Sequence, residues 1–284
     1  MKTLSVKSDR PIDPITVEVL RAVDAAARDL AIGYFVAGAM ARDIVLLNVF
    51  GFDTIRATRD LDLAVHVSGW DQFNALKKRL IDAHRFSMAN SAVQKVYSPS
   101  QYPVDLVPFG GVVERDGNIK WPPDQAIVMN VSGYDEALNT ALRVEVEAGL
   151  LIPVASLASL AMLKVFAWID RGRRDWNRKD AQDLALLLRR YADTLDPHEL
   201  YDEEASVLEA VDYDLERAGA RLLGKHVGRL AVPRTVSELL RHLEHQPTRN
   251  RLTIDMAQAL RQSDDPVERA DQYLGDFISG LSPS

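Results

Sequence analysis

Apolar residues recur along this chain with two periods, and the change between them divides the sequence. Up to about residue 155, short runs that alternate apolar and polar residues, as strands do, stand between helical patterns. From about residue 156 only helical patterns follow, over residues 156–170, 178–193, 199–220 and 234–245. We therefore expect an α+β fold, with a mixed sheet flanked by helices in residues 1–150 and a helical C-terminal domain in residues 151–284.

The first domain begins with a helix signal. Asp13 suits the N-cap position and Pro14 the first helical position. The residues that follow place an apolar stripe on one helix face, made of Ile15, Val19, Ala22, Ala26 and Leu30. An apolar run over residues 34–37 then passes through Gly38 into a second helical pattern. This order predicts a strand, a glycine turn and a helix.

The rest of the first domain alternates between strand and helix signals. Residues 60–67, "DLDLAVHV", place four apolar side chains on one face and predict a strand, and residues 70–83 predict a helix. Residues 92–97 and 102–109 predict two further strands. Three remaining segments are expected to be loops, hairpins or loose ends, at residues 1–10, 110–124 and 279–284.

Composition narrows the class of protein. With 284 residues, 47% of them hydrophobic, the chain has enough apolar material for a core. It contains no cysteine, which excludes disulfides and cysteine-based zinc or nucleophile chemistry and favours a cytoplasmic location. Pro153 and Lys164 interrupt the segment closest to a membrane span, residues 150–169, so we interpret it as a buried helix and expect no membrane partner. A net charge of −7 argues against indiscriminate nucleic-acid binding.

Two aspartates stand one residue apart at the start of the strand predicted over residues 60–67. Asp60 and Asp62 point to the same side of such a strand, with Cα atoms roughly 7 Å apart, so both carboxylates lean toward one point. A divalent cation, Mg²⁺ or Mn²⁺, relieves their repulsion and completes its shell with water and phosphate oxygens. Taken alone, "DLDL" is at least as typical of a solvated strand face.

Three further residues favour a metal and phosphate site over that simpler interpretation. Asp105 lies in "PVDLVPF", an apolar strand in which a lone carboxylate is disfavoured unless it faces the same cluster. Gly38, between strand and helix, lets backbone N–H groups approach an anion at a helix N-terminus. Thr58, two residues before Asp60, offers a hydroxyl to the same phosphates.

Several motifs, in this order, resemble those of a known family. "VAGAMARDIVL", "TRDLDL" and "VDLVPFGG" resemble the glycine turn, Asp-x-Asp strand and third aspartate of the polymerase-beta-like nucleotidyltransferase superfamily. "SLASLAMLKVFAWIDR" followed by "RKDAQDLALLL" is similar to the AbiEii-like group, which includes toxins of type IV toxin–antitoxin systems. The resemblance covers roughly residues 30–190. It implies a nucleotidyltransferase-type sheet and transfer of NMP from a nucleoside triphosphate to a hydroxyl group.

The resemblance also implies roles for residues of the first domain. Gly38 and Ala39 correspond to the nucleotide-binding turn, with Ala39 where the family usually has a second glycine or a serine. Asp60 and Asp62 correspond to the metal pair, and Asp105 to the third acidic position.

In the helical half, the resemblance makes Lys164 the phosphate-contacting lysine and Asp180 or Asp183 the later acidic position of the nucleotide site. The residues themselves leave alternatives open. Lys164 shares a helix face with core residues, so its ammonium either reaches water along the apolar surface or meets a triphosphate. Asp180 and Asp183 share a helix face and either steady Lys164 or Arg178 or belong to a solvated surface.

The acceptor of the nucleotide is the least constrained part of the hypothesis. Five basic residues cluster beside these motifs, at Arg171, Arg173, Arg174, Arg178 and Lys179. Such a cluster suits a polyanion such as tRNA or another RNA, and is equally typical of a solvated helix end. The leading hypothesis is an RNA-directed nucleotidyltransferase, as a toxin with a cognate antitoxin. The alternatives are a small-molecule nucleotidyltransferase of the antibiotic-modifying kind, or a non-catalytic nucleotide-binding or antitoxin-like module.

Overall fold

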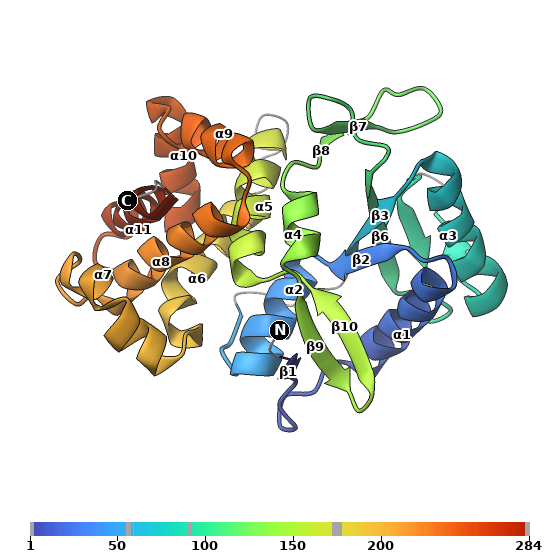
Figure 1. The fold of residues 1–284 in the computed structure, drawn as a ribbon, viewed down its shortest axis with the longest axis horizontal. Coiled ribbons are helices and arrows are strands. Elements are labelled where there is room, and N and C mark those ends of the chain that lie inside the picture. The colour runs from blue at the N-terminus through green and yellow to red at the C-terminus, as the bar shows by residue number, and fades with distance from the viewer. Residues whose placement is uncertain (1–2, 55–57, 59, 90–91, 172–177, 282–284) are drawn as a thin grey trace. The chain divides into compact units, whose positions relative to one another are not determined.

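The computed structural model describes residues 3–54, 58, 60–89, 92–171 and 178–281. The chain divides into two compact units, Met1–Ser156 and Leu157–Ser284, which we call the sheet unit and the helical unit (Figure 1). The first carries a mixed sheet with helices and the second is built of helices, which confirms the predicted α+β class. Across the described ranges, no helix is both long and apolar enough to cross a membrane.

A mixed sheet organises the sheet unit, with eight described strands in the order β1-β9-β10-β2-β3-β6-β5-β4. Their bounds are β1 (Thr3–Ser5), β2 (Gly33–Val36), β3 (Leu61–Val67), β4 (Ser87–Met88), β5 (Lys95–Tyr97), β6 (Pro103–Gly110), β9 (Leu142–Glu147) and β10 (Leu150–Val154). A separate hairpin consists of β7 (Asn118–Lys120) and β8 (Val128–Asn130). β3 lies near the middle of the sheet, antiparallel to β2 and parallel to β6.

The helices of this unit are α1 (Pro14–Asp29), α2 (Gly38–Asp43), α3 (Trp70–His84) and α4 (Tyr134–Asn139), with a π-helical segment, η1 (Ile44–Phe50), directly after α2. Asp13 caps α1 as predicted, because its carboxylate accepts the backbone N–H of Thr16 at 3.0 Å. The predicted apolar stripe is confirmed in part, since Val19 and Ala26 are buried, but Ile15 is 41% exposed. Leu20 and Val23, which the prediction left out, are fully buried.

Nine helical segments make up the described part of the helical unit (Figure 1). They are α5 (Leu157–Arg171), α6 (Lys179–Arg190), η2 (Ala192–Thr194), η3 (Glu199–Glu203), α7 (Ala205–Glu209), α8 (Leu215–Leu230), α9 (Pro233–Leu243), α10 (Gln246–Ala257) and α11 (Pro266–Leu281).

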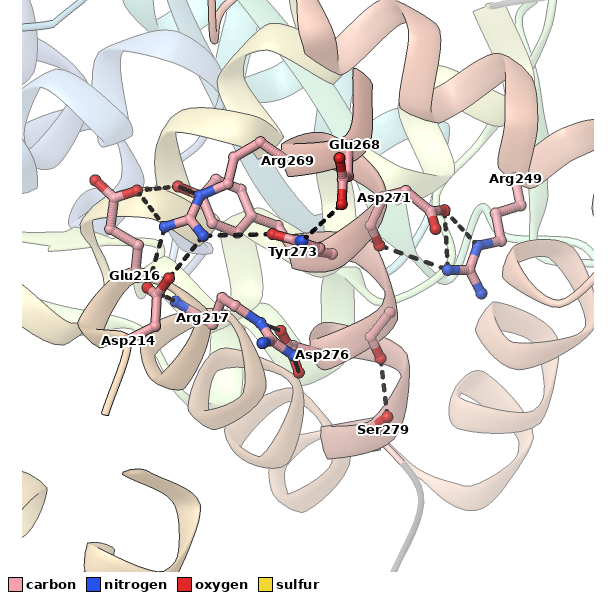
Figure 2. A network of polar contacts seen from close by, with 12 residues as sticks. Asp214, Glu216, Arg217, Arg249, Glu268, Arg269, Asp271, Tyr273, Asp276 and Ser279 are labelled. Carbon is pink, nitrogen blue, oxygen red and sulfur yellow. Dashed lines mark hydrogen bonds and ion pairs between the residues drawn. The ribbon is translucent and has the colours of Figure 1, made fainter. Parts of the chain in front are cut away.

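Figure 2 shows polar contacts between two of these helices, α8 and α11. Arg269 of α11 donates to Asp214, the N-cap of α8, at 2.6 Å and to Glu216 at 3.1 Å. Arg217 of α8 donates in return to Asp276 of α11 at 2.8 Å. These ion pairs run in both directions and hold the two helices together.

Two predicted segments differ from the structure because strand pairing supplies partners that a local pattern does not reveal. Within residues 1–10, which we expected to be loose, β1 pairs in parallel with β9. The buried helix expected over residues 150–169 begins as a strand, since β10 pairs with both β9 and β2 before α5 starts at Leu157.

The helix predicted over residues 199–220 is interrupted. Asp212 and Tyr213 both adopt left-handed backbone conformations, with φ of 54° and 59°. Consecutive residues in this region cannot continue a right-handed helix. The segment therefore breaks before α8, whose new N-terminus is capped by Asp214.

Candidate active site

The turn from β2 into α2 touches the strand that carries the paired aspartates. Gly38 has a φ of +63°, and a Cβ atom added there would lie 1.9 Å from Oδ2 of Asp62. The backbone N–H of Ala37 donates to the carbonyl oxygen of Asp62 at 2.9 Å. Both the backbone conformation and the lack of space require glycine at this position. The glycine turn and the acid pair, which follow each other in the sequence, are therefore in direct contact in the structure.

Strand pairing brings the third aspartate, Asp105, next to Asp62. Asp62 of β3 and Asp105 of β6 are direct register partners on neighbouring parallel strands. Asp60 lies in the bend immediately before β3 and is partly exposed, as Asp62 and Asp105 are. The sheet therefore gathers Gly38 and the three predicted acids at the ends of adjacent strands.

The two carboxylate oxygens of Asp105 have different surroundings. Oδ2 lies 3.1 Å from the ammonium nitrogen of Lys95, its cross-strand neighbour on β5. Oδ1 is buried and has no hydrogen-bond partner among the described residues. A buried carboxylate oxygen without a partner is costly to a folded protein, and such positions often serve function.

The negative charges of Asp105 and Asp60 act on the pKa of Lys95. Burial alone lowers the pKa of Lys95, but the hydrogen bond and charge of Asp105, with a smaller effect from Asp60, raise it above its ordinary value. Lys95 is thus held as a cation beside the acids, and sequence reasoning missed it.

These donors fit a hard divalent cation in their chemistry, since carboxylate oxygens are preferred ligands of Mg²⁺ and Mn²⁺. The buried oxygen of Asp105 without a partner supports this fit. Among the residues that the structure describes, no group of three or more histidine or acidic side chains is arranged to hold a metal ion. In this conformation Lys95, rather than a shared cation, neutralises Asp105.

In the helical unit, Lys164 of α5 contacts both acids of α6. Its ammonium nitrogen lies 2.8 Å from Oδ1 of Asp180 and 2.7 Å from Oδ2 of Asp183. All three residues are buried. Burial lowers the pKa of Lys164, but the two carboxylates outweigh it and raise the pKa above its ordinary value. The structure therefore excludes both a solvated lysine and a solvated acidic face here.

Two residues of the predicted basic cluster, Arg171 and Arg178, form ion pairs with neighbouring acids. Arg171 lies 3.5 Å from Asp180, with a side chain that is still 54% exposed, and Arg178 lies 3.0 Å from Asp255. Lys179 is exposed. Arg173 and Arg174 lie outside the described residues.

Comparison with known proteins decides the family. Residues 22–275 match the family model described as nucleotidyl transferase AbiEii toxin, type IV TA system. The chain belongs to the AbiEii family. It is accordingly a nucleotidyltransferase, which bears out the family resemblance of its motifs. The sequence matches none of the curated proteins.

Solved structures similar to this AbiEii-family chain are distant. The antibiotic-resistance factor ANT(2'')-Ia is 16% identical, with 71% of this chain and 99% of that one covered and a TM-score of 0.41. A nucleotidyltransferase-like protein from Paracoccidioides brasiliensis is 17% identical, with coverage of 74% and 94% and a TM-score of 0.41. The CCA-adding enzyme of Thermotoga maritima, complexed with tRNA, is 13% identical, with coverage of 99% and 85% and a TM-score of 0.28.

One predicted phosphate ligand of this AbiEii-family chain is engaged elsewhere. The hydroxyl of Thr58 donates to Oδ2 of Asp43, whose Oδ1 accepts two N–H groups of Arg42 at 2.8 and 2.6 Å. Arg42 is fully buried, and sequence reasoning missed this pair. Its signal was two adjacent opposite charges, "RD", inside the apolar stretch that follows Gly38.

Proposed function

We propose that this nucleotidyltransferase transfers NMP from a nucleoside triphosphate to a hydroxyl group of an RNA acceptor, with tRNA as the leading candidate. The single observation that carries the site assignment is the contact of Gly38 with Asp62, which is itself in register with Asp105. In the reaction, the acceptor oxygen bonds to the α-phosphorus while the bond to the bridging oxygen of pyrophosphate breaks. The proton of the acceptor hydroxyl passes to a carboxylate of the site.

In this proposal, different residues of the sheet unit bind the metal ion, accept the proton and contact the phosphates. Asp60 and Asp62 hold a divalent cation, Mg²⁺ or Mn²⁺, and Asp105 either completes its shell or accepts the hydroxyl proton. The cation, when bound, orients the triphosphate and offsets negative charge. The backbone N–H groups of Gly38 and Ala39, at the start of α2, face the phosphates.

Lys164, Asp180 and Asp183 are assigned to the triphosphate in the same proposal. Because Lys164 already contacts two buried carboxylates, those acids fix where its ammonium points. We propose that this fixed ammonium donates to a phosphate oxygen with its remaining N–H group, since an ammonium has three. Thr58 also stays a proposed phosphate ligand, through the oxygen lone pairs that its bond to Asp43 leaves available.

The RNA acceptor is supported by the exposed basic residues at the end of α5 and the start of α6. Arg171 keeps more than half of its side chain exposed although it contacts Asp180, and Lys179 is exposed as well. Phosphate groups of a nucleic acid favour such cations.

The test is incubation of the full chain with each labelled nucleoside triphosphate, Mg²⁺ and total RNA, followed by separation of RNA from small molecules. We expect label in a defined RNA fraction with one preferred nucleotide. Label that enters only a small-molecule acceptor would replace the RNA proposal with the antibiotic-modifying kind. No transfer under any combination, with Mg²⁺ or Mn²⁺, would contradict NMP transfer by this chain.

We also propose that the chain acts as a toxin that a cognate antitoxin counteracts, because the family is described as the toxin of a type IV system. Induced expression of the parent should then arrest bacterial growth, and expression of the Asp60→Asn, Asp62→Asn variant should not. Equal growth arrest by both proteins would separate toxicity from nucleotide transfer.

A further inference from the structure

The chain itself supplies a cation to the candidate metal site. Lys95 on β5 is the register partner of Asp105 on β6, and its ammonium nitrogen lies 3.1 Å from the Oδ2 atom. The two side chains are 27% and 18% exposed, so the ion pair lies mostly out of solvent. Water and salt screen such a pair less than they screen pairs on the surface.

We propose that Lys95 is a resident counter-ion that competes with the divalent cation for Asp105. The inference rests on the proposed function, in which Asp60 and Asp62 hold that cation and Asp105 is the third acid. An ammonium group and a divalent cation repel each other strongly at one carboxylate. Lys95 therefore neutralises Asp105 in the metal-free protein, and its ammonium must move away before Asp105 can take part in metal binding.

A lysine suits this exchange. Its charge sits on a flexible four-carbon stem, so the ammonium can leave Asp105 without movement of β5. Once displaced, it has lost a carboxylate partner and favours another anion, such as a phosphate oxygen of the bound nucleotide. Metal and nucleotide then reinforce each other's binding through Lys95, and by linkage this effect is reciprocal.

The direct test measures Mn²⁺ binding to the full chain without nucleotide, from the spectroscopic signal of free Mn²⁺. We expect Lys95→Met to bind Mn²⁺ at least about tenfold more tightly than the parent, because the competing charge is gone. Lys95→Arg keeps the charge and should bind like the parent. Lys120→Met is the matched control: Lys120 pairs with Glu114 at 2.8 Å in the same unit, so this change removes the same charge elsewhere.

The second measurement is the melting temperature with a chelator and with Mn²⁺. Without metal, Lys95→Met should melt lower than the parent, because Asp105 loses its cation while its other oxygen is already without a partner among the described residues. Saturating Mn²⁺ should reverse that loss. A purely structural ion pair would lower the melting temperature and leave Mn²⁺ affinity unchanged.

The outcomes separate this inference from the proposed function. If Lys95→Met binds Mn²⁺ no more tightly than Lys120→Met does, the counter-ion role is wrong while the metal site stands. If the parent and every variant fail to bind Mn²⁺, the metal assignment is overturned and the role of Lys95 with it. Should Lys95→Met not fold, Lys95→Gln replaces it, since glutamine keeps a donor for Asp105 without the charge.

Discussion

Buried acids in the helical unit meet basic side chains from neighbouring helices, whereas the candidate acids of the sheet unit, Asp62 and Asp105, lie side by side on two paired strands. Asp180 and Asp183 of α6 share Lys164 of α5, and Asp276 of α11 takes Arg217 of α8. Figure 2 shows how such pairs connect α8 and α11. Each pair joins two elements, so its charges contribute to how the helices pack.

The candidate acids of the sheet unit, Asp62 and Asp105, show a different arrangement. The side chain of Asp62 lies so close to Gly38 that a Cβ atom at position 38 would have no space. Asp62 is also the register partner of Asp105. Asp105 has Lys95 on one oxygen and a buried second oxygen without a partner in the described part of the chain.

We propose that this difference separates carboxylates whose charge a buried basic side chain compensates from carboxylates of the sheet unit that are kept for a cation. A buried charge is tolerated when a partner compensates it, as in the helical unit. A site for a cation must instead keep acids together and incompletely compensated, at a cost in stability. The two arrangements predict opposite responses to removal of the charges.

The largest expected effect tests the sheet unit. Replacing Asp60 and Asp62 with asparagine should lower nucleotide transfer on the order of 10⁴-fold, because amide oxygens bind Mg²⁺ poorly. The metal-free variant should melt no lower than the metal-free parent, since converging carboxylates repel each other when empty. Transfer rates and melting curves with and without Mg²⁺ check both outcomes.

A matched control uses two exposed carboxylates of α3, in the variant Asp71→Asn, Asp82→Asn. It removes the same charge from the same unit and should transfer nucleotide at the parent's rate. A folded Asp60→Asn, Asp62→Asn protein that is equally active would disprove the assignment of the metal pair.

The second prediction tests the helical unit. Lys164→Met should lower the free energy of unfolding by about 3–5 kcal/mol, because two buried carboxylates lose their shared cation. The double variant Lys164→Met, Asp183→Asn should lose less, because one uncompensated charge is then absent. Denaturant unfolding measures both, with Lys179→Met as the exposed control on α6. A loss below about 1 kcal/mol for Lys164→Met would place this cluster with ordinary surface ion pairs.

The third prediction separates backbone strain from contact with the acid pair. Gly38→Ala should lower transfer about 10²-fold, because the new methyl group displaces Asp62. Gly149→Ala is the control: Gly149 also has a positive φ, of +77°, but nothing lies within 4 Å of its added Cβ. Both variants should lose about 1 kcal/mol of stability from the backbone conformation alone. Equal activity of the two variants would mean that the Gly38 contact does not position Asp62.

Local sequence patterns could predict one part of the site. The strand–glycine–helix order at Gly38 and the alternation of "DLDL" are properties of adjacent residues, so the turn and the strand were both correctly predicted. The alternation "LRVEVE" over β9 carried the same kind of signal, and β9 was nevertheless missed.

The partners of the acids were harder to predict, since they depend on register and packing. Lys95 meets Asp105 only because β5 and β6 pair in one particular register, which no local pattern specifies. The spacing of Asp180 and Asp183 predicts a shared helix face, but whether that face meets Lys164 or water depends on how α5 and α6 pack.

The smallest expected effect concerns His226 of α8, in the helical unit. Its ring contacts the hydroxyl of Tyr191 and lies 3.5 Å from a carboxylate oxygen of Glu199. Burial lowers the pKa of His226 from its ordinary 6.5, helped by the positive charges of Arg229 and Lys225, although Glu204 acts in the other direction. The folded protein therefore keeps this ring neutral at a pH where the unfolded chain protonates it.

The sign of the resulting pH dependence follows from proton uptake. As the pH falls below 6.5, the unfolded chain binds a proton at His226 that the folded chain does not, so the free energy of unfolding decreases. The slope from this one group is at most about 1.4 kcal/mol per pH unit. Glu199 opposes this loss of stability at lower pH, because burial and neighbouring acids raise its pKa and make the folded state the stronger proton binder.

The measurement is the free energy of unfolding of the parent and of His226→Gln between pH 7.5 and 5. The two values should converge as the pH falls, while the exposed control His198→Gln should follow the parent. Parallel curves for the parent and His226→Gln would mean that His226 does not titrate with unfolding.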